Sequence, residues 1–301
     1  VASVLLASRG GAGPVVVMMP RGLATKWPRE WEQFKSLCAL DPQRLTTIRD
    51  RFVRTPTEFF KALDETPSRR PHLIWMTTGC LSQGLNDPWV KLALIRLGRS
   101  ETRMSDEVKK RLNKWTSTLT RLKSYRRFTV DLVDRLMRVD INRWRDILVG
   151  EQILPDDAPD PVPRHLIQNR HRIDWTELND VIRGKAIPGR RGNVSDQRLR
   201  DARSDFNDAC KNVYEQWLML ANWRAPLLVL DEAHHAKNDR TRLASLLRSE
   251  DTDRLIEHRD RREARPLLSD KSDRILFLPA TPFHCDHRLV IVLCRSFAFA
   301  N

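Results

Sequence analysis

The 301-residue sequence lacks the features of small stapled proteins and of membrane-spanning proteins. It has five cysteines, an odd number, and no C-x-x-C pair, which argues against a disulfide framework and a zinc ribbon. We therefore expect a reducing, cytoplasmic compartment. No apolar run approaches the ~18–20 residues that a membrane-spanning helix needs, so we expect no membrane among the partners.

The beginning of the sequence, VASVLLASRGG, has no initiator Met and no basic residues ahead of its apolar stretch. It is therefore not a signal peptide. It is typical of the interior of a helix, and we expect the sequence to be a piece of a longer protein.

The charge balance points to a polyanionic partner. Lys+Arg is 53 and Asp+Glu is 39, so 53 − 39 gives the formal net charge of +14. Hydrophobic residues make up 41% and charged residues 31%, which is the balance of a globular protein with material for a core. An excess of basic residues this large favours nucleic acid over an anionic membrane surface.

Short, continuous apolar runs predict buried strands of a parallel sheet, because such strands are covered on both faces and do not alternate. Helical patterns lie between them, so the outer parts of the chain predict an α/β fold. The four runs are Val15–Met19, Leu73–Met76, Leu227–Leu230 and Ile275–Leu278.

The middle of the chain, residues 99–223, shows no convincing strand and predicts a helical insertion between the two parts of the α/β domain, 1–98 and 224–301. Apolar residues at steps of three and four predict one helix from Met104 to Leu122 and another from Leu132 to Leu148. Four prolines between Pro155 and Pro163 predict an extended linker. A third helix is expected to begin after Ser195 as its N-cap residue.

The most informative stretch is PLLVLDEAHHAKN, where an apolar strand ends directly in Asp231 and Glu232. At the carboxyl edge of a parallel sheet, adjacent carboxylates lie where ligands bind. One carboxylate can hold the Mg²⁺ of a nucleotide, and the other can orient the attacking water. The alternative is that both carboxylates only cap a following helix. A zinc site at His234 and His235 is disfavoured, because adjacent residues on a helix point apart.

A second strand, Ile275–Leu278, leads into Pro279-Ala280-Thr281-Pro282-Phe283. If this strand lies beside the first, the Thr281 hydroxyl can hydrogen-bond the carboxylate site. By itself the segment is an ordinary exit from a strand and indicates no function. Only its position downstream of DEAH makes it a candidate part of the same site.

DEAH followed by the A-T-P strand exit resembles motifs II and III of superfamily-two helicases and translocases. The longer forms DEAHHAKN and ATPFH are most similar to the Swi/Snf-type and bacterial RapA-like branch. MMPRGL with KWPREW resembles motif Ia of that branch, and LIWMTTGCLS resembles motif Ib. The order Ia, Ib, II, III is that of the family.

The resemblance implies the first RecA-like lobe of an ATP-driven motor that moves along nucleic acid, DNA rather than RNA, in a bacterial or archaeal cell. ATP and Mg²⁺ are the implied cofactors, and a second RecA-like lobe is the implied partner. Motif II maps the metal to Asp231 and the water-activating carboxylate to Glu232. Coupling to nucleic acid maps to His234, Ala280 and Thr281. Phosphate contacts map to Pro20, Arg21 and Gly22 in motif Ia, and to Thr77, Thr78 and Gly79 in motif Ib.

Three features depart from the family pattern. The sequence contains no G-x-x-x-x-G-K-[ST], and the Gly-rich segment Arg9–Gly13 precedes a strand and is expected to be a turn. The sequence ends about twenty residues after motif III, before a second lobe. The roughly 150 residues between motifs Ib and II exceed what the branch predicts. Without a phosphate-loop Lys and a second lobe, we expect the chain as printed not to turn over ATP effectively.

The segment Arg103–Arg127 holds nine Lys/Arg and two Asp/Glu, a net charge of +7. On an amphipathic helix its basic face is a candidate track for nucleic-acid phosphates, with Lys109, Lys110, Arg126 and Arg127 as contacts. The alternative is a solvated helical face. For the protein as a whole, the alternative to a motor is a non-catalytic nucleic-acid-binding module on a degenerate motor fold. An unrelated α/β hydrolase or kinase is disfavoured, since neither signature is found.

Overall fold

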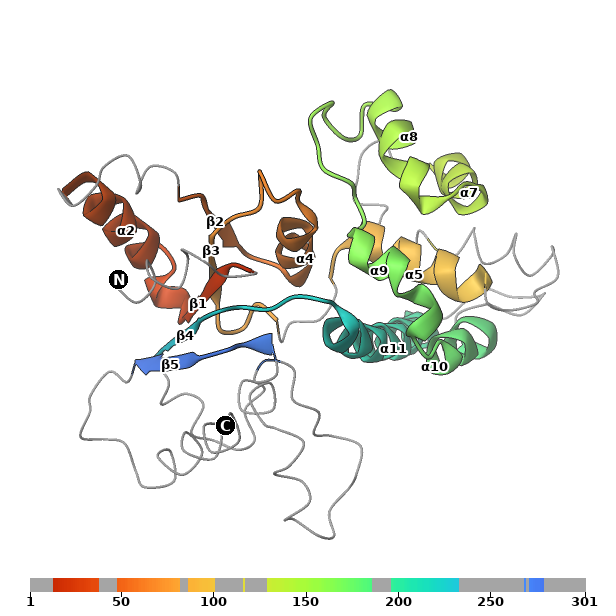
Figure 1. Cartoon of the computed structure of the whole chain (residues 1–301). Coiled ribbons are helices and arrows are strands. Elements are labelled where there is room, and N and C mark those ends of the chain that lie inside the picture. The colour runs from red at the N-terminus through yellow and green to blue at the C-terminus, as the bar shows by residue number, and fades with distance from the viewer. Residues whose placement is uncertain are drawn as a thin grey trace, which may run out of the picture. The chain divides into compact units, whose positions relative to one another are not determined.

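The computed structural model describes residues 13–37, 48–81, 86–100, 116, 129–185, 196–232, 268 and 271–278 (Figure 1). The chain divides into two compact units. The sheet unit takes its described residues from Val1–Gln83 and Asn222–Asn301, and the helical unit takes its own from Gly84–Ala221. The units therefore divide near residues 83 and 221, whereas the sequence analysis divides the chain after residues 98 and 223.

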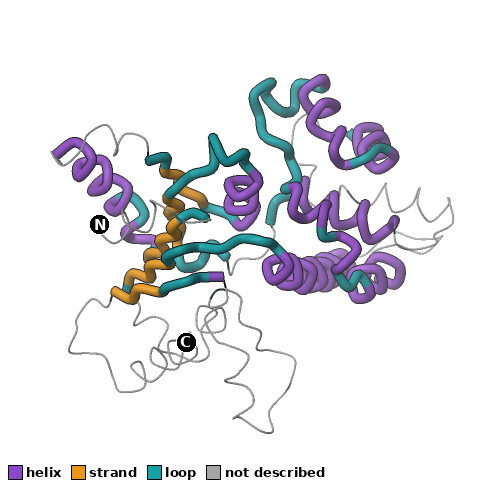
Figure 2. The backbone as a smooth tube through the Cα atoms, in the orientation of Figure 1, coloured by secondary structure: helices purple, strands orange, loops and turns teal. Residues whose placement is uncertain are grey.

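The sheet unit is built on a five-stranded parallel sheet with the order β2-β3-β1-β4-β5 (Figures 1 and 2). This arrangement confirms the α/β class expected from the continuous apolar runs. The strands are β1 (Val15–Met19), β2 (Asp50–Val53), β3 (Leu73–Thr77), β4 (Leu228–Asp231) and β5 (Ile275–Leu278).

Central and edge strands differ in how well the sequence marks them. β1 and the apolar parts of β3 and β4 are buried on both faces, as their continuous runs predict. β2 has only two apolar residues, Phe52 and Val53, and the sequence analysis missed it. β5 lies at the opposite edge and is only half-buried, with Leu276 38% exposed, so the expectation of a buried strand was wrong there.

Two helices of the sheet unit, α2 (Lys26–Leu37) and α4 (Pro56–Asp64), follow from the strand order. The chain moves from β1 past β3 to β2, and then back from β2 to β3. Right-handed crossovers in opposite directions place their helices on opposite faces of a sheet, and Figure 1 shows α2 and α4 on opposite sides of the strands. α4 begins at a Thr55 cap whose hydroxyl accepts a hydrogen bond from the Glu58 amide at 3.2 Å.

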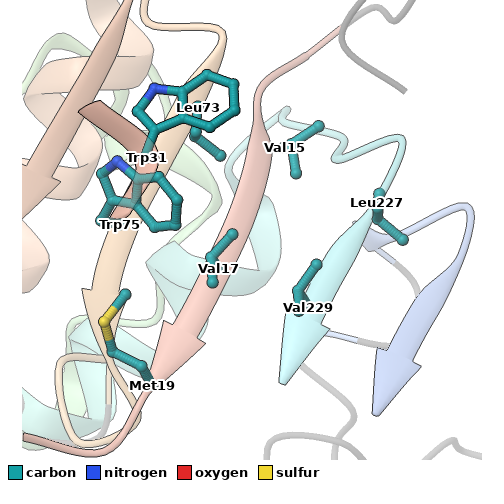
Figure 3. Close-up of a cluster of buried hydrophobic side chains, with 8 residues drawn as sticks. All are labelled: Val15, Val17, Met19, Trp31, Leu73, Trp75, Leu227 and Val229. Atoms are coloured by element: carbon teal, nitrogen blue, oxygen red, sulfur yellow. The ribbon is translucent and has the colours of Figure 1, made fainter. Parts of the chain in front are cut away.

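The core beneath α2 combines alternate residues of the three central strands with one tryptophan of the helix. Trp31 and Trp75 meet with ring centroids 6.3 Å apart, and Trp31 also stacks on Phe34. Figure 3 shows how these side chains fill one face of the sheet. The fully enclosed members are Val15, Val17, Met19, Trp31, Leu73, Trp75, Leu227 and Val229.

The helical unit contains no strand among its described residues, in agreement with the sequence analysis of this region. Its longer helices are α5 (Pro88–Ser100), α7 (Val130–Arg138), α8 (Trp144–Gly150) and α11 (Asp196–Leu220). Shorter elements are η3 (Ile141–Arg143), α9 (Arg164–Gln168), η4 (Arg170–Arg172), α10 (Thr176–Asp180) and η5 (Val181–Lys185). None of the helices described in either unit is long and apolar enough to cross a membrane.

The single helix expected over residues 132–148 is two helices. α7 ends at Arg138, and the Asp140 carboxylate accepts a hydrogen bond from the Asn142 amide at 2.9 Å, which starts a new turn. The apolar residues of both helices are still buried, and the Trp144 indole N–H donates to the Leu136 carbonyl across the break at 2.8 Å. The periodicity therefore predicted the buried face correctly and the continuity wrongly.

Two other expectations for this unit can be compared with the structure. α11 begins at Asp196, directly after Ser195, where a helix was expected to begin; Phe206, Cys210 and Trp217 are buried on it, whereas Leu199 is only half-buried. The proline-rich segment has no helix or strand, as an extended linker requires, and its last three residues, 161–163, are buried. The helix expected over residues 104–122 and the N-cap Ser195 lie outside the described residues, Thr116 excepted.

Candidate functional site

The described candidate residues of the sheet unit gather at one edge of the sheet. All five strands are parallel, so their carboxyl ends meet there. Thr77 pairs with Met19 in register, and Asp231 pairs with Leu278. Met18 of β1 pairs with Leu230 of β4. The next residues, Met19 and Asp231, therefore lie side by side at the ends of these two central strands.

The centre of the edge is also a topological switch point. From β1 the chain goes to β2 on one side of the sheet, and from β4 it goes to β5 on the other side. β1 and β4 are neighbours, so their connections leave in opposite directions. In open α/β sheets, ligands bind outside the carboxyl ends of the strands at such a point. This position lies between the end of β1 at Met19 and the end of β4 at Asp231.

The Asp231 carboxylate is held by a donor on each oxygen. The Trp27 indole N–H donates to Oδ2 at 2.7 Å, and the Glu232 amide donates to Oδ1 at 2.9 Å. A carboxylate has about four acceptor positions on its two oxygens, so each oxygen keeps room for another partner. The side chain is half-buried, and its orientation is defined from two sides.

Glu232 follows in a strained backbone conformation. Its φ is 54°, in the left-handed region that non-glycine residues rarely adopt. Such strain costs on the order of 1–3 kcal/mol and gathers at sites of function.

The residues assigned to phosphate contact lie at the same edge. Pro20, Arg21 and Gly22 follow β1 directly, and Arg21 and Gly22 are exposed. Thr77 ends β3, Thr78 and Gly79 follow it, and all three are half-buried. The structure describes no hydrogen bond or ion pair between the side chains of Arg21, Thr77 or Thr78 and other described residues. The Thr78 amide already donates to the Met19 carbonyl at 2.9 Å, so the hydroxyls and the guanidinium are the available donors.

The remaining candidates lie outside the described residues. These are the coupling residues His234, Ala280 and Thr281, and the basic residues Lys109, Lys110, Arg126 and Arg127. Their assignments stay predictions. The alternative that Asp231 and Glu232 cap a following helix also concerns residues that are not described.

The donor set at this edge is suited to a hard cation shared with a phosphate ligand. Mg²⁺ prefers oxygen donors and commonly takes one or two carboxylates together with substrate phosphates. Asp231 and its neighbour Glu232 supply such oxygens. Among the described residues no group of three or more His, Cys, Asp or Glu forms an all-protein metal cage, so any cation here would draw further ligands from elsewhere.

A cysteine near this edge is unsuited to nucleophilic chemistry. Cys80 follows Gly79 directly and is fully buried. Burial, together with the nearby Glu58 carboxylate, raises the pKa of the Cys80 thiol to about 12. The thiolate is the reactive form of cysteine, so Cys80 is a packing residue.

Sequence reasoning missed the role of Trp27. It quoted this residue within the motif Ia resemblance and gave it no partner, although the indole contacts the Asp231 carboxylate 204 positions away. No local pattern could have found this pairing, because it depends on α2 crossing the face of the sheet to β4.

Comparisons with protein-family models, curated proteins and solved structures found no match to this chain.

Proposed function

We propose that this chain is the first RecA-like lobe of a superfamily-two, Swi/Snf-like motor that uses ATP to move along nucleic acid, most readily double-stranded DNA. The observation that carries the proposal is the Asp231-Glu232 pair at the carboxyl end of β4, beside the end of β1 at the switch point. The motif order along the sequence and the net charge of +14 support it. The helical unit would be an insertion into this lobe.

In this proposal the residues at the edge have separate roles. Asp231 would hold Mg²⁺, and Glu232 would orient the water that attacks the terminal phosphate. When bound, the metal would neutralise charge on the nucleotide phosphates. Arg21, Thr77 and Thr78 would contact the phosphate backbone of the nucleic acid, which positions the strand without reading its sequence. The basic residues between Arg103 and Arg127 would extend this track.

A second candidate is a non-catalytic nucleic-acid-binding module on the same fold. It is favoured by one observation, the net charge of +14, which accounts for binding to nucleic acid without any nucleotide. The two candidates differ in whether nucleotide changes nucleic-acid binding. In a motor lobe Mg²⁺ and ATP bind at Asp231 and alter the affinity for DNA, whereas in a module they do not.

Binding of a fluorescein-labelled DNA duplex, followed by anisotropy between 50 and 200 mM salt, tests the proposed interface. We expect Arg21→Ala to weaken binding and to reduce the slope of log K against log salt by about 1, because one phosphate contact is lost. The matched control is Arg69→Ala. Arg69 is equally exposed but lies in the turn before β3, at the opposite edge of the sheet. Equal effects of the two substitutions would refute the carboxyl edge as the interface.

The same assay separates the two candidates. In the full-length protein, we expect ATP with Mg²⁺ to change the DNA affinity of the wild type and not that of Asp231→Asn. If the wild-type affinity does not respond to ATP with Mg²⁺, the non-catalytic module is the better description. Single-stranded DNA and duplex RNA of the same sequence, used in parallel, identify the preferred track.

A further inference from the structure

Three tryptophans on one face of the sheet unit differ in what their indole N–H groups contact. Trp27 donates to Asp231 at 2.7 Å, and Trp75 donates to the Asp50 carboxylate at 3.1 Å. Among the described residues, the buried Nε1 of Trp31 has no hydrogen-bond partner. The rings otherwise share one cluster, since the centroids of Trp27 and Trp31 lie 6.1 and 6.3 Å from that of Trp75.

Trp27 reaches Asp231 because helix and strand present their side chains to the same space. Alternate residues of a strand lie on one face of a sheet, so Asp231 shares its face with Leu227 and Val229. That face is covered by α2, whose Trp31 packs in the same cluster (Figure 3). Trp27 lies one turn before Trp31, nearer the start of α2, and contacts the end of β4.

The bond has the geometry of a strong interaction. A hydrogen bond to a charged acceptor is shorter and about twice as strong as a neutral one, and 2.7 Å is at the short end of that range. It is also partly buried, which limits competition from water. It occupies only one acceptor position of Oδ2, so it fixes the direction of the carboxylate and leaves oxygen available for a ligand.

We infer that Trp27 is the positioning residue of Asp231, and that its indole sets the affinity of this carboxylate for a divalent cation. This inference rests on the proposed function, because it assigns the cation to Asp231. Groups that hydrogen-bond a metal ligand from behind fix its orientation, and removing one costs about 10–100-fold in metal affinity or activity. Trp27 stands in this relation to Asp231.

Packing alone does not account for the bond. Trp31 is the more buried of the two residues on α2, and its indole N–H has no partner. The cluster therefore does not require each indole to find a carboxylate. A purely structural role for Trp27 predicts that replacing it with Phe has the same consequences as replacing Trp75 or Trp31 with Phe.

The test compares Trp27→Phe with Trp75→Phe. Both substitutions keep an aromatic ring and remove one indole–carboxylate hydrogen bond. Only the bond of Trp27 is made to a carboxylate of the candidate site, Asp231. The probe is Mn²⁺ alone, added to the whole chain labelled with 5-fluorotryptophan and followed by ¹⁹F NMR. The Trp27 resonance is assigned by its absence in Trp27→Phe. We expect paramagnetic broadening of this resonance at Mn²⁺ concentrations that leave the Trp75 resonance sharp.

We expect Trp27→Phe to weaken Mn²⁺ binding by about 10-fold, and Trp75→Phe to leave it within about two-fold. Affinity in both variants is read from the free Mn²⁺ signal in electron paramagnetic resonance, which needs no enzyme activity. A second measurement does not depend on any Trp substitution. Asp231→Asn should shift the Trp27 ¹⁹F resonance and leave that of Trp75 in place, since only Trp27 donates to this side chain.

The outcomes separate the inference from the proposed function. If Asp231→Asn binds Mn²⁺ as tightly as the wild type, the cation is not held by Asp231 and the proposed metal role is refuted. If Asp231→Asn loses Mn²⁺ binding while Trp27→Phe retains it fully, only the positioning role is overturned. An unchanged Trp27 resonance in Asp231→Asn would overturn that role even if Trp27→Phe failed to fold.

Discussion

The polar groups at the two edges of the parallel sheet differ in their contacts. The strands begin at one edge, the amino edge, and end at the other, the carboxyl edge. At the amino edge, side chains are used to join the ends of strands. The Arg49 guanidinium donates to the carbonyls of Arg70 and Pro67, and the Arg49 amide donates to Nδ1 of His72. Arg224 pairs with Asp273, so the beginnings of β4 and β5 are tied together as well.

At the carboxyl edge the described side chains of Arg21, Thr77 and Thr78 make no such contacts with other described residues. Asp231 is oriented by two donors, and Glu232 stands in a strained conformation. The contrast indicates that the amino edge contributes stability, whereas the proposed function places a ligand at the carboxyl edge. Backbone strain lowers stability, so it persists where another requirement outweighs it.

The largest expected loss of stability comes from a substitution at the amino edge. A Cβ on Gly13 would lie 1.7 Å from the Arg224 carbonyl oxygen, so no side chain fits without moving the backbone before β4. We expect Gly13→Ala to lower the free energy of unfolding by about 3–5 kcal/mol, at the top of the range for single substitutions. Urea denaturation followed by circular dichroism measures this loss.

The control for this substitution lies at the carboxyl edge. A Cβ on Gly22 would meet nothing within 4 Å, so Gly22→Ala should change stability by less than about 0.5 kcal/mol. Similar midpoints for Gly13→Ala and Gly22→Ala would contradict the view that the amino edge is the closely packed one.

The next prediction concerns substitutions that relieve backbone strain, one at the carboxyl edge of the sheet and one in the helical unit. Glu232 and Gln152 have φ values of 54° and 53°, and both adopt a conformation that glycine adopts freely. Gln152 lies two residues after the end of α8; its amide donates to the Val149 carbonyl, and the Ile153 amide donates to the Leu148 carbonyl. This is the Schellman pattern, in which glycine is usual. Glycine at either position should raise the free energy of unfolding by about 0.5–1 kcal/mol.

The two glycine substitutions should differ in their effects on the proposed function. Gln152→Gly should leave nucleic-acid and Mn²⁺ binding unchanged. Glu232→Gly should gain stability and abolish ATP hydrolysis by the full-length protein, because it removes the carboxylate assigned to the attacking water. If Glu232→Gly lowers stability, the strain at this edge has been read incorrectly.

How far the sequence predicts this molecule depends on how local each feature is. β1 could be predicted because a strand buried on both faces needs a continuous apolar run, and Asp231 because it ends such a run. β2 could not, since an edge strand with Asp50 and Arg51 lacks that pattern. Trp27 could not be assigned a role, because its partner is fixed by the crossing of α2 over the sheet.

The smallest expected effect returns to the amino edge, where His72 joins two strands. Its carbonyl accepts a hydrogen bond from the Val15 amide at 2.8 Å, and its Nδ1 accepts one from the Arg49 amide at 3.1 Å. Burial, and then the positive charge of Arg49, lower the pKa of His72 below its usual value near 6.5. The folded protein thus favours the neutral imidazole, whose Nδ1 can act as the acceptor.

The sign of the pH dependence follows. Above pH 6.5 both the folded and the unfolded chain hold His72 neutral, and its contribution to stability is complete. As the pH falls below 6.5 the unfolded chain takes up the proton first, so stability decreases. We expect the Tm of the wild type to fall between pH 7.5 and 5.5 by about 1–2 °C more than that of His72→Gln, which keeps an acceptor that does not titrate. Since the other histidines are the same in both proteins, an equal fall in both would show that His72 does not contribute, and that the amino edge is held by its backbone and arginine contacts alone.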